Sequence, residues 1–280
     1  MELGVMMFPT DKAIQPIPLA VEAESRGFAS IWFPEHSHIP SSRETPWGGR
    51  EGAPPLPEEY WRSHDQFVAL AAVAGATTSI KLATGITLVA QRDPLWLSKE
   101  VASLDMISDG RFIFGIGYGW NKEEMRNHGL AYTDRRAVVR EHILACKAIW
   151  ADDEFSFSGD HVDYEPSWSW PKPSQEPHPP ILMGAAPGPK TVADIVEYCD
   201  GWMPIHGRYD ILEELPAIKD AWAAGGRDPE RFSWGVFAVP PDPEVIEAYT
   251  GAGADYAAFA LPSNDADDIL PRLDKLAALL

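Results

Sequence analysis

Short apolar runs alternate with amphipathic helical stretches along the whole chain. The apolar runs that predict strands cover residues 3–8, 28–33, 80–86, 111–116, 181–183, 201–205, 234–239 and 256–261. The stretches that predict helices cover residues 16–27, 65–78, 94–108, 135–151, 190–198, 211–224, 243–251 and 266–280. Eight strand–helix units predict a closed (β/α)8 TIM barrel made of one domain, residues 1–280. An open, doubly wound sheet is the competing architecture.

Two irregular stretches, residues 35–62 and 152–179, are too long to be simple connections. Long loops on a barrel usually carry function, so we expect both to form lids or substrate walls. They contain four of the tryptophans, Trp47, Trp61, Trp168 and Trp170. These rings either line a pocket for a flat apolar ligand or pack the loops against the barrel rim.

The charge balance limits the partners. With 23 basic and 42 acidic residues, the chain has a formal net charge of −19. An acidic surface repels phosphate backbones and anionic lipids, so we expect neither nucleic acid nor a membrane as partner. An anionic cofactor would have to be held by backbone N–H groups and a few well-placed cations.

Cysteine usage and the N-terminus predict a cytoplasmic protein. The two cysteines, Cys146 and Cys199, lie far apart in apolar stretches, which is typical of buried, reduced thiols. The first residues lack the basic and long apolar regions of a signal peptide, and no run of about 18 apolar residues predicts a spanning helix. The histidines, including His36 and His38, have no convincing metal-ligand spacing, so no metal site is predicted.

Polar residues that directly follow a strand face the catalytic rim of a barrel. Glu35 and His36 follow the strand over 28–33, and a histidine there is suited to move protons near neutral pH. On position alone, a catalytic histidine and an ordinary surface histidine are equally good interpretations.

Glycines mark the ends of two further strands. Gly85 ends the strand over 80–86, where it either lets a ligand ring approach the backbone or forms a simple bulge. Gly115, Gly117 and Gly119 resemble a dinucleotide fingerprint, but Trp120 occupies the third glycine position and no helix is predicted there. We therefore interpret these glycines as space for a flat ligand.

A loop of small residues precedes the helix predicted over 190–198. It contains Gly184, Ala185, Ala186 and Gly188 and leads into Lys190 and Thr191. Free N–H groups at a helix N-terminus bind phosphate well, and Lys190 would add charge. The other interpretation is an ordinary connection; we favour the phosphate site.

Together these segments resemble the luciferase-like monooxygenase superfamily, in particular the branch that uses the deazaflavin coenzyme F420. The resemblance covers nearly the whole chain and is most specific over 80–124, where it includes Ala83–Ile86, Arg92–Pro94, Gly110–Phe112, Gly115–Trp120 and Glu123–Glu124. It implies a (β/α)8 barrel, a homodimer, and a flavin or deazaflavin at the strand C-termini. It also implies a non-prolyl cis peptide at Gly85–Ile86 that supports the back of the ring.

The resemblance also implies the site residues. We expect catalysis from His36 and Glu35, and cofactor contacts from Glu35, Thr84, Gly85, Ile86, Thr87, Gly117, Trp120, Gly184, Ala185, Ala186, Gly188, Lys190 and Thr191. A sugar-phosphate dehydrogenase of this branch has tryptophan where Pro40 stands here and a catalytic glutamate where Trp120 stands. Because this chain departs at both positions, we do not predict a sugar-phosphate substrate.

Three functions follow from these expectations. The first is an oxidoreductase that transfers a hydride between F420 and a small organic substrate. The second is an FMN-dependent monooxygenase that takes reduced flavin from a partner reductase. The third is a flavin-binding barrel without catalysis.

Overall fold

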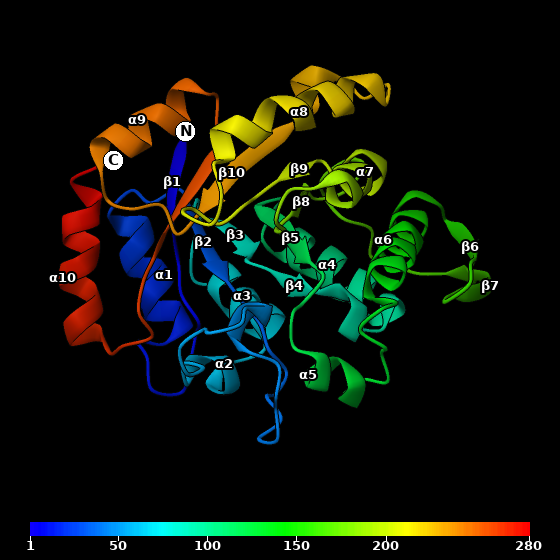
Figure 1. The fold of residues 1–280 in the computed structure, drawn as a ribbon, viewed down its shortest axis with the longest axis horizontal. Helices are drawn as coiled ribbons and strands as arrows, with labels where there is room; N and C mark the ends of the chain where they lie inside the picture. The colour runs from blue at the N-terminus through cyan, green and yellow to red at the C-terminus, as the bar shows by residue number, and fades with distance from the viewer.

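The computed structural model describes residues 1–280 and contains a closed ring of parallel strands (Figure 1). The strands of the ring are β1 (Glu2–Met6), β2 (Ser30–Phe33), β3 (Lys81–Thr84), β4 (Thr87–Leu88), β5 (Phe112–Gly117), β8 (Ile181–Met183), β9 (Gly201–Trp202), β10 (Ser233–Phe237) and β11 (Tyr256–Ala260). Pairing of β1 with β11 and of β3 with β5 closes the ring. The predicted barrel is therefore confirmed and the open sheet is excluded.

Strands β3 and β4 occupy one position in the barrel, separated by Gly85 and Ile86. Leu82 pairs with Phe112 and Thr87 pairs with Ile116. Between these two pairs, the segment of β3 and β4 therefore contains one residue more than β5, which is a bulge. The peptide bond between Gly85 and Ile86 is cis, as the resemblance implied. Counted in this way, the barrel has the eight strand positions expected from the sequence.

Helices surround the ring of strands. They are α1 (Pro16–Ser25), α3 (Gln66–Ala74), α4 (Pro94–Ile107), α6 (Arg135–Ala151), α7 (Pro189–Tyr198), α8 (Ile211–Ala224), α9 (Pro243–Gly251) and α10 (Ala266–Ala277). Most begin where the sequence provides a start signal. Asp65, as the sequence suggested, and also Asp93, Asp210, Asp242 and Asp265 accept a hydrogen bond from a backbone N–H of the first turn, which stabilises the helix end.

The core has two layers. The larger layer lies between strands and helices and contains 56 buried residues. The smaller one fills the barrel interior with one side chain from nearly every strand position: Trp32, Ala83, Ile113, Leu182, Met203, Phe237 and Ala258. The rings of Trp32 and Phe237 meet edge to face with centroids 5.2 Å apart. Because the interior is packed, a ligand has to bind above it, at the C-terminal ends of the strands, which we call the barrel mouth.

Several short elements were not predicted. They are α2 (Glu59–Arg62), α5 (Lys122–Asn127), the hairpin of β6 (Glu154–Ser158) and β7 (Asp163–Trp168), and the 3-10 turns Trp47–Gly49, Val89–Gln91 and Pro229–Arg231. The strand expected over 201–205 contracts to Gly201–Trp202. The short helix α5 starts two residues after Trp120, where none was expected.

The prediction that residues 152–179 form a wall of the site was wrong. Strand β6 packs along the outside of α6, and Glu141 of α6 accepts the backbone N–H groups of residues 160–162 in the hairpin turn. Gln175 then donates to the carbonyl of Phe112, at the amino end of β5. The segment thus runs outside and below the barrel, and Figure 1 shows β6 and β7 beyond α6. Trp168 is 78% exposed and lines no pocket at the mouth.

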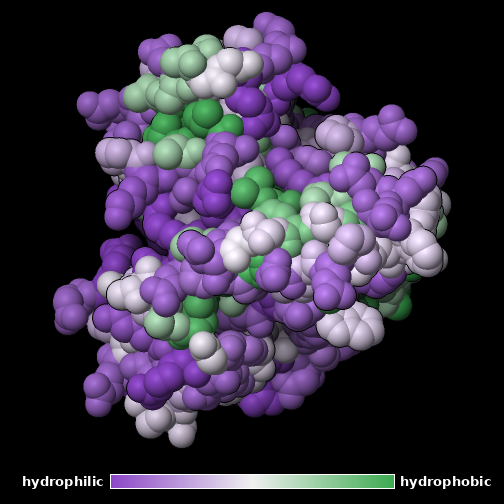
Figure 2. Space-filling view, turned by 90° about the vertical axis from the view of Figure 1, so that its right-hand side faces the viewer, coloured by the Kyte–Doolittle hydropathy of each residue, from purple (hydrophilic) through white to green (hydrophobic).

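The surface fits the charge balance of the sequence. The face on which β6 and β7 lie is predominantly hydrophilic, with hydrophobic groups in separate patches (Figure 2). Both cysteines are buried and free, as expected from the sequence. None of the helices combines the length and apolar character needed to cross a bilayer.

Candidate functional site

His36 lies at the barrel mouth, three residues after β2 ends, and it is paired with a buried carboxylate. Its Nδ1 atom is 2.7 Å from Oε2 of Glu124, which belongs to the first turn of α5. The His36 side chain is 5% exposed and that of Glu124 is fully buried. The Nε2 atom of His36 makes no hydrogen bond within the chain and is the only ring nitrogen available to a ligand. The geometry therefore favours the catalytic interpretation of this histidine.

Glu35 points away from His36, toward β4. Its carboxylate accepts the backbone N–H of Leu88 at 2.6 Å and forms an ion pair with Arg92, with Nη2 to Oε2 at 2.6 Å. Arg92 also donates to Asp65 and Glu100. Burial opposes the charge of Arg92, but these carboxylates outweigh it and raise its pKa. Both carboxylate oxygens of Glu35 thus connect β2 with β4. This geometry gives Glu35 a structural role in the wall of the site.

Aromatic rings surround the imidazole of His36. The imidazole centroid lies 5.2 Å from the ring of Tyr60, 5.7 Å from that of Trp120 and 6.5 Å from that of Phe8. Trp47 packs edge to face against Tyr60 at 5.8 Å. Burial raises the pKa of Tyr60, so its hydroxyl stays protonated at neutral pH and can donate a hydrogen bond. Residues 35–62 therefore do contribute to the site, as predicted for this loop.

Gly85 and Ile86 carry the accessible part of their strand. From residue 82 to residue 90, they alone are half-buried, and all the others are buried. A Cβ atom built on Gly117 would lie 2.7 Å from Cδ1 of Ile86, and one on Gly184 would lie 2.4 Å from its Cγ2. The absence of side chains at Gly117 and Gly184 thus makes room for Ile86, and the cofactor contacts expected at both glycines stay predictions.

The two threonines that flank this dipeptide lie in the barrel wall. Both are fully buried. The hydroxyl of Thr84 donates to the carbonyl of Gly115 at 2.7 Å, and that of Thr87 accepts from Gln66 at 3.0 Å. Their expected contact with a cofactor is not supported by this placement, because the hydroxyls are used within the wall.

The loop before α7 has unpaired backbone donors. The N–H groups of Ala185, Ala186, Gly188, Lys190 and Thr191 make no hydrogen bond within the chain. The Lys190 side chain is exposed. Arg136 of α6 also reaches this loop: its Nη2 donates to Oγ1 of Thr191 at 2.8 Å, while its Nη1 pairs with Asp194 at 2.6 Å. Free amides beside an arginine form a suitable environment for a phosphate group.

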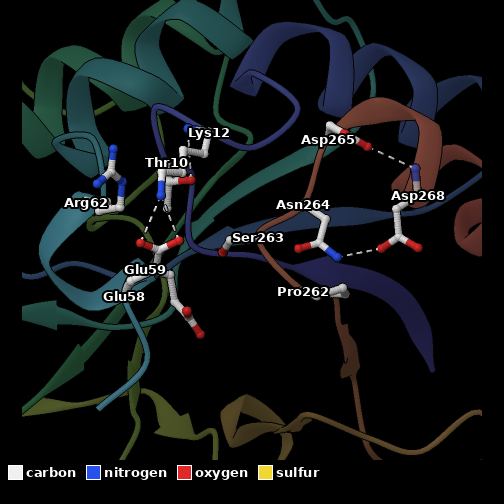
Figure 3. A pocket seen from close by; sticks show the side chains of 10 residues that line it. All are labelled: Thr10, Lys12, Glu58, Glu59, Arg62, Pro262, Ser263, Asn264, Asp265 and Asp268. Carbon is white, nitrogen blue, oxygen red and sulfur yellow. Dashed lines mark hydrogen bonds and ion pairs between the residues drawn. The ribbon is translucent and has the colours of Figure 1, made fainter. Parts of the chain in front are cut away.

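Two hollows open on the rim. The first has a volume of about 360 Å³ and is lined by Glu35, His36, Arg92 and His128, among others. The second, drawn in Figure 3, lies where β1 and β11 end. Among its polar groups, Lys12 pairs with Glu58 at 3.0 Å and the Asn264 amide donates to Asp268 at 2.7 Å. The first hollow contains His36 and is therefore the one that belongs to the site.

Sequence reasoning missed three residues of this site. Glu124 was noted only as part of the family motif, although its carboxylate contacts His36 across 88 residues of chain. Arg136 starts α6 within an Arg-Arg pair, and this basic pair was the available signal. Tyr60 lies inside an irregular stretch without periodicity, so no pattern pointed to it.

The fold and the site define a (β/α)8-barrel enzyme with its candidate site at the C-terminal ends of the strands. The chain belongs to the luciferase-like monooxygenase family, whose model matches residues 12–266. Its relatives include an F420-dependent hydroxymycolic acid dehydrogenase of Mycobacterium tuberculosis and an FMNH2-dependent dimethylsulfone monooxygenase of Pseudomonas putida. The protein is therefore a flavin- or deazaflavin-dependent oxidoreductase of this family.

The similarities differ in extent. An uncharacterised protein of Mycobacterium tuberculosis is 37% identical over 284 residues, covering 100% of this chain and 99% of the relative. The hydroxymycolic acid dehydrogenase is 27% identical, covering 79% of this chain and 56% of the relative. The dimethylsulfone monooxygenase is 28% identical, covering 72% and 60%.

Two solved structures show the same fold. The monooxygenase RslO1 from Streptomyces bottropensis has a TM-score of 0.82 at 20% identity, covering 100% of this chain and 98% of that one. An F420-dependent secondary alcohol dehydrogenase, solved with an F420–acetone adduct, has a TM-score of 0.77 at 18% identity with the same coverage. At these identities the likeness concerns the fold alone.

Proposed function

We propose that this protein transfers a hydride between coenzyme F420 and a small organic substrate, and that His36 exchanges the accompanying proton. The observation that carries this proposal is the free Nε2 atom of His36 at the barrel mouth. Strand β2 pairs with β3 up to Phe33 and Thr84, so His36 and Ile86 follow at similar height in neighbouring strands. A histidine suited to proton exchange thus follows the strand next to the one that carries the half-buried dipeptide.

The residues present fit a flat, anionic cofactor. The ring would rest against Gly85 and Ile86, the accessible part of an otherwise buried strand. The phosphate would bind the free N–H groups of residues 185–191 with Arg136 beside them. When bound, the deazaflavin supplies a two-electron hydride acceptor or donor.

The surroundings of His36 favour an uncharged substrate that has both apolar surface and a polar group. Phe8, Tyr60 and Trp120 present ring surface to His36. The adjoining hollow adds polar groups, among them Ser37, His64 and His128. The tyrosine hydroxyl can orient a substrate oxygen, which an alcohol or carbonyl compound provides. Trp120 stands where the sugar-phosphate dehydrogenases of the F420 branch have a glutamate, and this also favours a substrate without phosphate.

A binding titration tests the cofactor. Purified protein is titrated with F420 and, separately, with FMN, and binding is followed by cofactor fluorescence. The proposal predicts a dissociation constant for F420 in the micromolar range or below and weaker binding of FMN. Absence of F420 binding would overturn it. An Arg136→Gln variant should weaken F420 binding about tenfold if the phosphate lies beside this guanidinium.

The FMN-dependent alternative makes a different prediction. Reduced FMN from a partner reductase would be oxidised with consumption of oxygen in the presence of substrate. Support for this alternative comes from the relative named as an FMNH2-dependent dimethylsulfone monooxygenase. Oxygen uptake that depends on added reduced FMN would favour it over F420. A protein inactive with both cofactors over a broad substrate panel would favour a binding protein.

We also propose that the protein is a homodimer that associates through α3 and α4. These helices pack against each other and expose several large apolar side chains. Val68 is 71% exposed and Trp96 is 70% exposed, and Leu95, Met106 and Ile107 also lie on the surface. Exposed apolar side chains on adjacent helices are typical of a protein interface.

A further inference from the structure

Glu124 is fully buried and faces two groups that belong to the loop after β2. Its Oε2 atom lies 2.7 Å from Nδ1 of His36, and its Oε1 atom accepts the backbone N–H of Ser37 at 3.2 Å. The start of α5 fixes its backbone, because Asn121 accepts the N–H of Glu124 with its side-chain oxygen. Each carboxylate oxygen thus has one defined partner.

The chemistry of these partners determines where the histidine proton lies. The Ser37 N–H can only donate, and an ionised carboxylate can only accept. With Glu124 ionised, the short contact to Nδ1 is a hydrogen bond in which Nδ1 carries the proton. In a neutral imidazole, the other nitrogen then has the lone pair, so Nε2 is an acceptor on the open side of the ring.

We infer that Glu124 is a positioning residue that fixes His36 in the Nδ1–H tautomer, so that Nε2 serves as the proton acceptor in substrate oxidation. This inference rests on the proposed function for the identity of the reaction. Glu124 itself has no exposed surface and touches no substrate. Its effect passes through the orientation and the tautomer of His36.

The reaction balances with these groups and the deazaflavin. In alcohol oxidation, the O–H proton moves to Nε2 of His36 while the hydride leaves the carbinol carbon for the deazaflavin. The C–O single bond becomes a carbonyl, the substrate loses two electrons and the deazaflavin gains them. In the reverse direction, the protonated imidazole returns its Nε2 proton to the developing alkoxide while the reduced deazaflavin returns the hydride.

The Glu124→Gln variant tests the inference because it preserves size but replaces one acceptor with a donor. The Ser37 N–H requires the amide oxygen, so the amide NH2 group faces Nδ1 and forces the histidine proton onto Nε2. We expect ¹⁵N spectra of histidine-labelled, cofactor-free protein to show the Nδ1–H tautomer for His36 in the wild type and the Nε2–H tautomer in the variant. A His36→Ala variant assigns the signal.

Turnover gives the second readout. We expect kcat to fall at least tenfold in Glu124→Gln, while KM and the dissociation constant of F420 stay within about twofold. The matched control is Glu123→Gln: Glu123 accepts the N–H groups of Glu44 and Thr45 through Oε1 alone, and a glutamine can do the same. This control should leave both tautomer and kcat unchanged.

The experiments distinguish a failure of this inference from a failure of the proposed function. An Nε2–H tautomer in the wild type, or an unchanged tautomer in Glu124→Gln, overturns the inference, and the wild-type spectrum alone decides if the variant does not fold. A loss of activity that appears only in KM or in F420 affinity also overturns it. If the tautomer changes as expected but the wild type binds no F420, the positioning role stands and the proposed function fails.

Discussion

At the residue scale, Arg92 joins three carboxylates on three separate elements. Its guanidinium is 18% exposed and contacts Glu35 after β2, Asp65 before α3 and Glu100 in α4. It also packs over the ring of Phe67, with Cζ 4.8 Å from the centroid. Together with the bond from Leu88 to Glu35, this arrangement fixes the loop that carries His36 relative to β4, α3 and α4.

Replacing Arg92 with methionine should destabilise the protein by about 3 kcal/mol. The variant leaves Glu35, which is 9% exposed, as a buried charge without its cation. The exposed pair of Arg140 and Glu197, at 45% and 42% exposure, provides the control, because Arg140→Gln should cost less than about 1 kcal/mol. Urea unfolding measures both. Equal losses in the two variants would contradict the structural role assigned to Arg92.

Some residues of the site could be predicted from the sequence, but the residues that they contact could not. His36 stands directly after a predicted strand, and this position alone places it at the rim. Its contact with Glu124 depends on how β2 and α5 lie relative to each other in the barrel, and no local sequence pattern determines this. The burial of Thr84 and Thr87 in the barrel wall could not be predicted either, because side chains alternate between the two faces of a strand and a bulge at Gly85 changes that alternation.

At the element scale, Glu24 of α1 connects this helix to the start of β3. Its Oε1 atom accepts the backbone N–H groups of residues 78–80 and the hydroxyl of Ser79. Burial opposes ionisation of this carboxyl group, but the hydrogen bonds outweigh it and lower its pKa from 4.5 to about 2. The link therefore depends on the charged form.

The pH dependence of this link has a definite sign. Because the pKa is lower in the folded state, Glu24 contributes its full stabilisation above pH 4.5, and the contribution is lost as the pH falls toward 2. The difference in unfolding free energy between the wild type and Glu24→Gln should therefore be larger at pH 6 than at pH 3. Chemical denaturation at both values measures it. A difference that does not change with pH would show that the charge of Glu24 is irrelevant.

The long helices and most strands could be predicted because their periodicity is local. The hairpin of β6 and β7 could not, because its strands expose most of their side chains and show no clear apolar pattern. Its placement outside α6 depends on Glu141, which accepts three N–H groups of the hairpin turn from another element. Length alone suggested a wall of the site, and length does not tell on which end of a barrel a segment lies.

At the scale of the whole molecule, the proposed dimer depends on the apolar surface of α3 and α4. Trp96→Glu introduces a charge into this surface and should convert the dimer into a monomer, which sedimentation velocity detects. Trp168→Glu changes an equally exposed tryptophan on the hairpin and should leave the dimer intact. A wild-type monomer, or dissociation by both variants, would contradict the assignment of this face.

The architecture as a whole explains why the site lies at one end of the barrel. Trp32, Phe237 and Met203 help to fill the interior, so no ligand can enter the barrel. The accessible functional groups, the Nε2 atom of His36, the dipeptide of Gly85 and Ile86 and the free amides of residues 185–191, all follow strand ends. We therefore expect a single cofactor position.

A crystal structure of the protein soaked with F420 tests this claim most directly. The account predicts the deazaflavin ring against Gly85 and Ile86, its phosphate within hydrogen-bond distance of the amides of residues 185–191 or of Arg136, and Nε2 of His36 facing the substrate space above the ring. A cofactor bound at any other place, or a ring that leaves His36 Nε2 without access to the substrate, would contradict it.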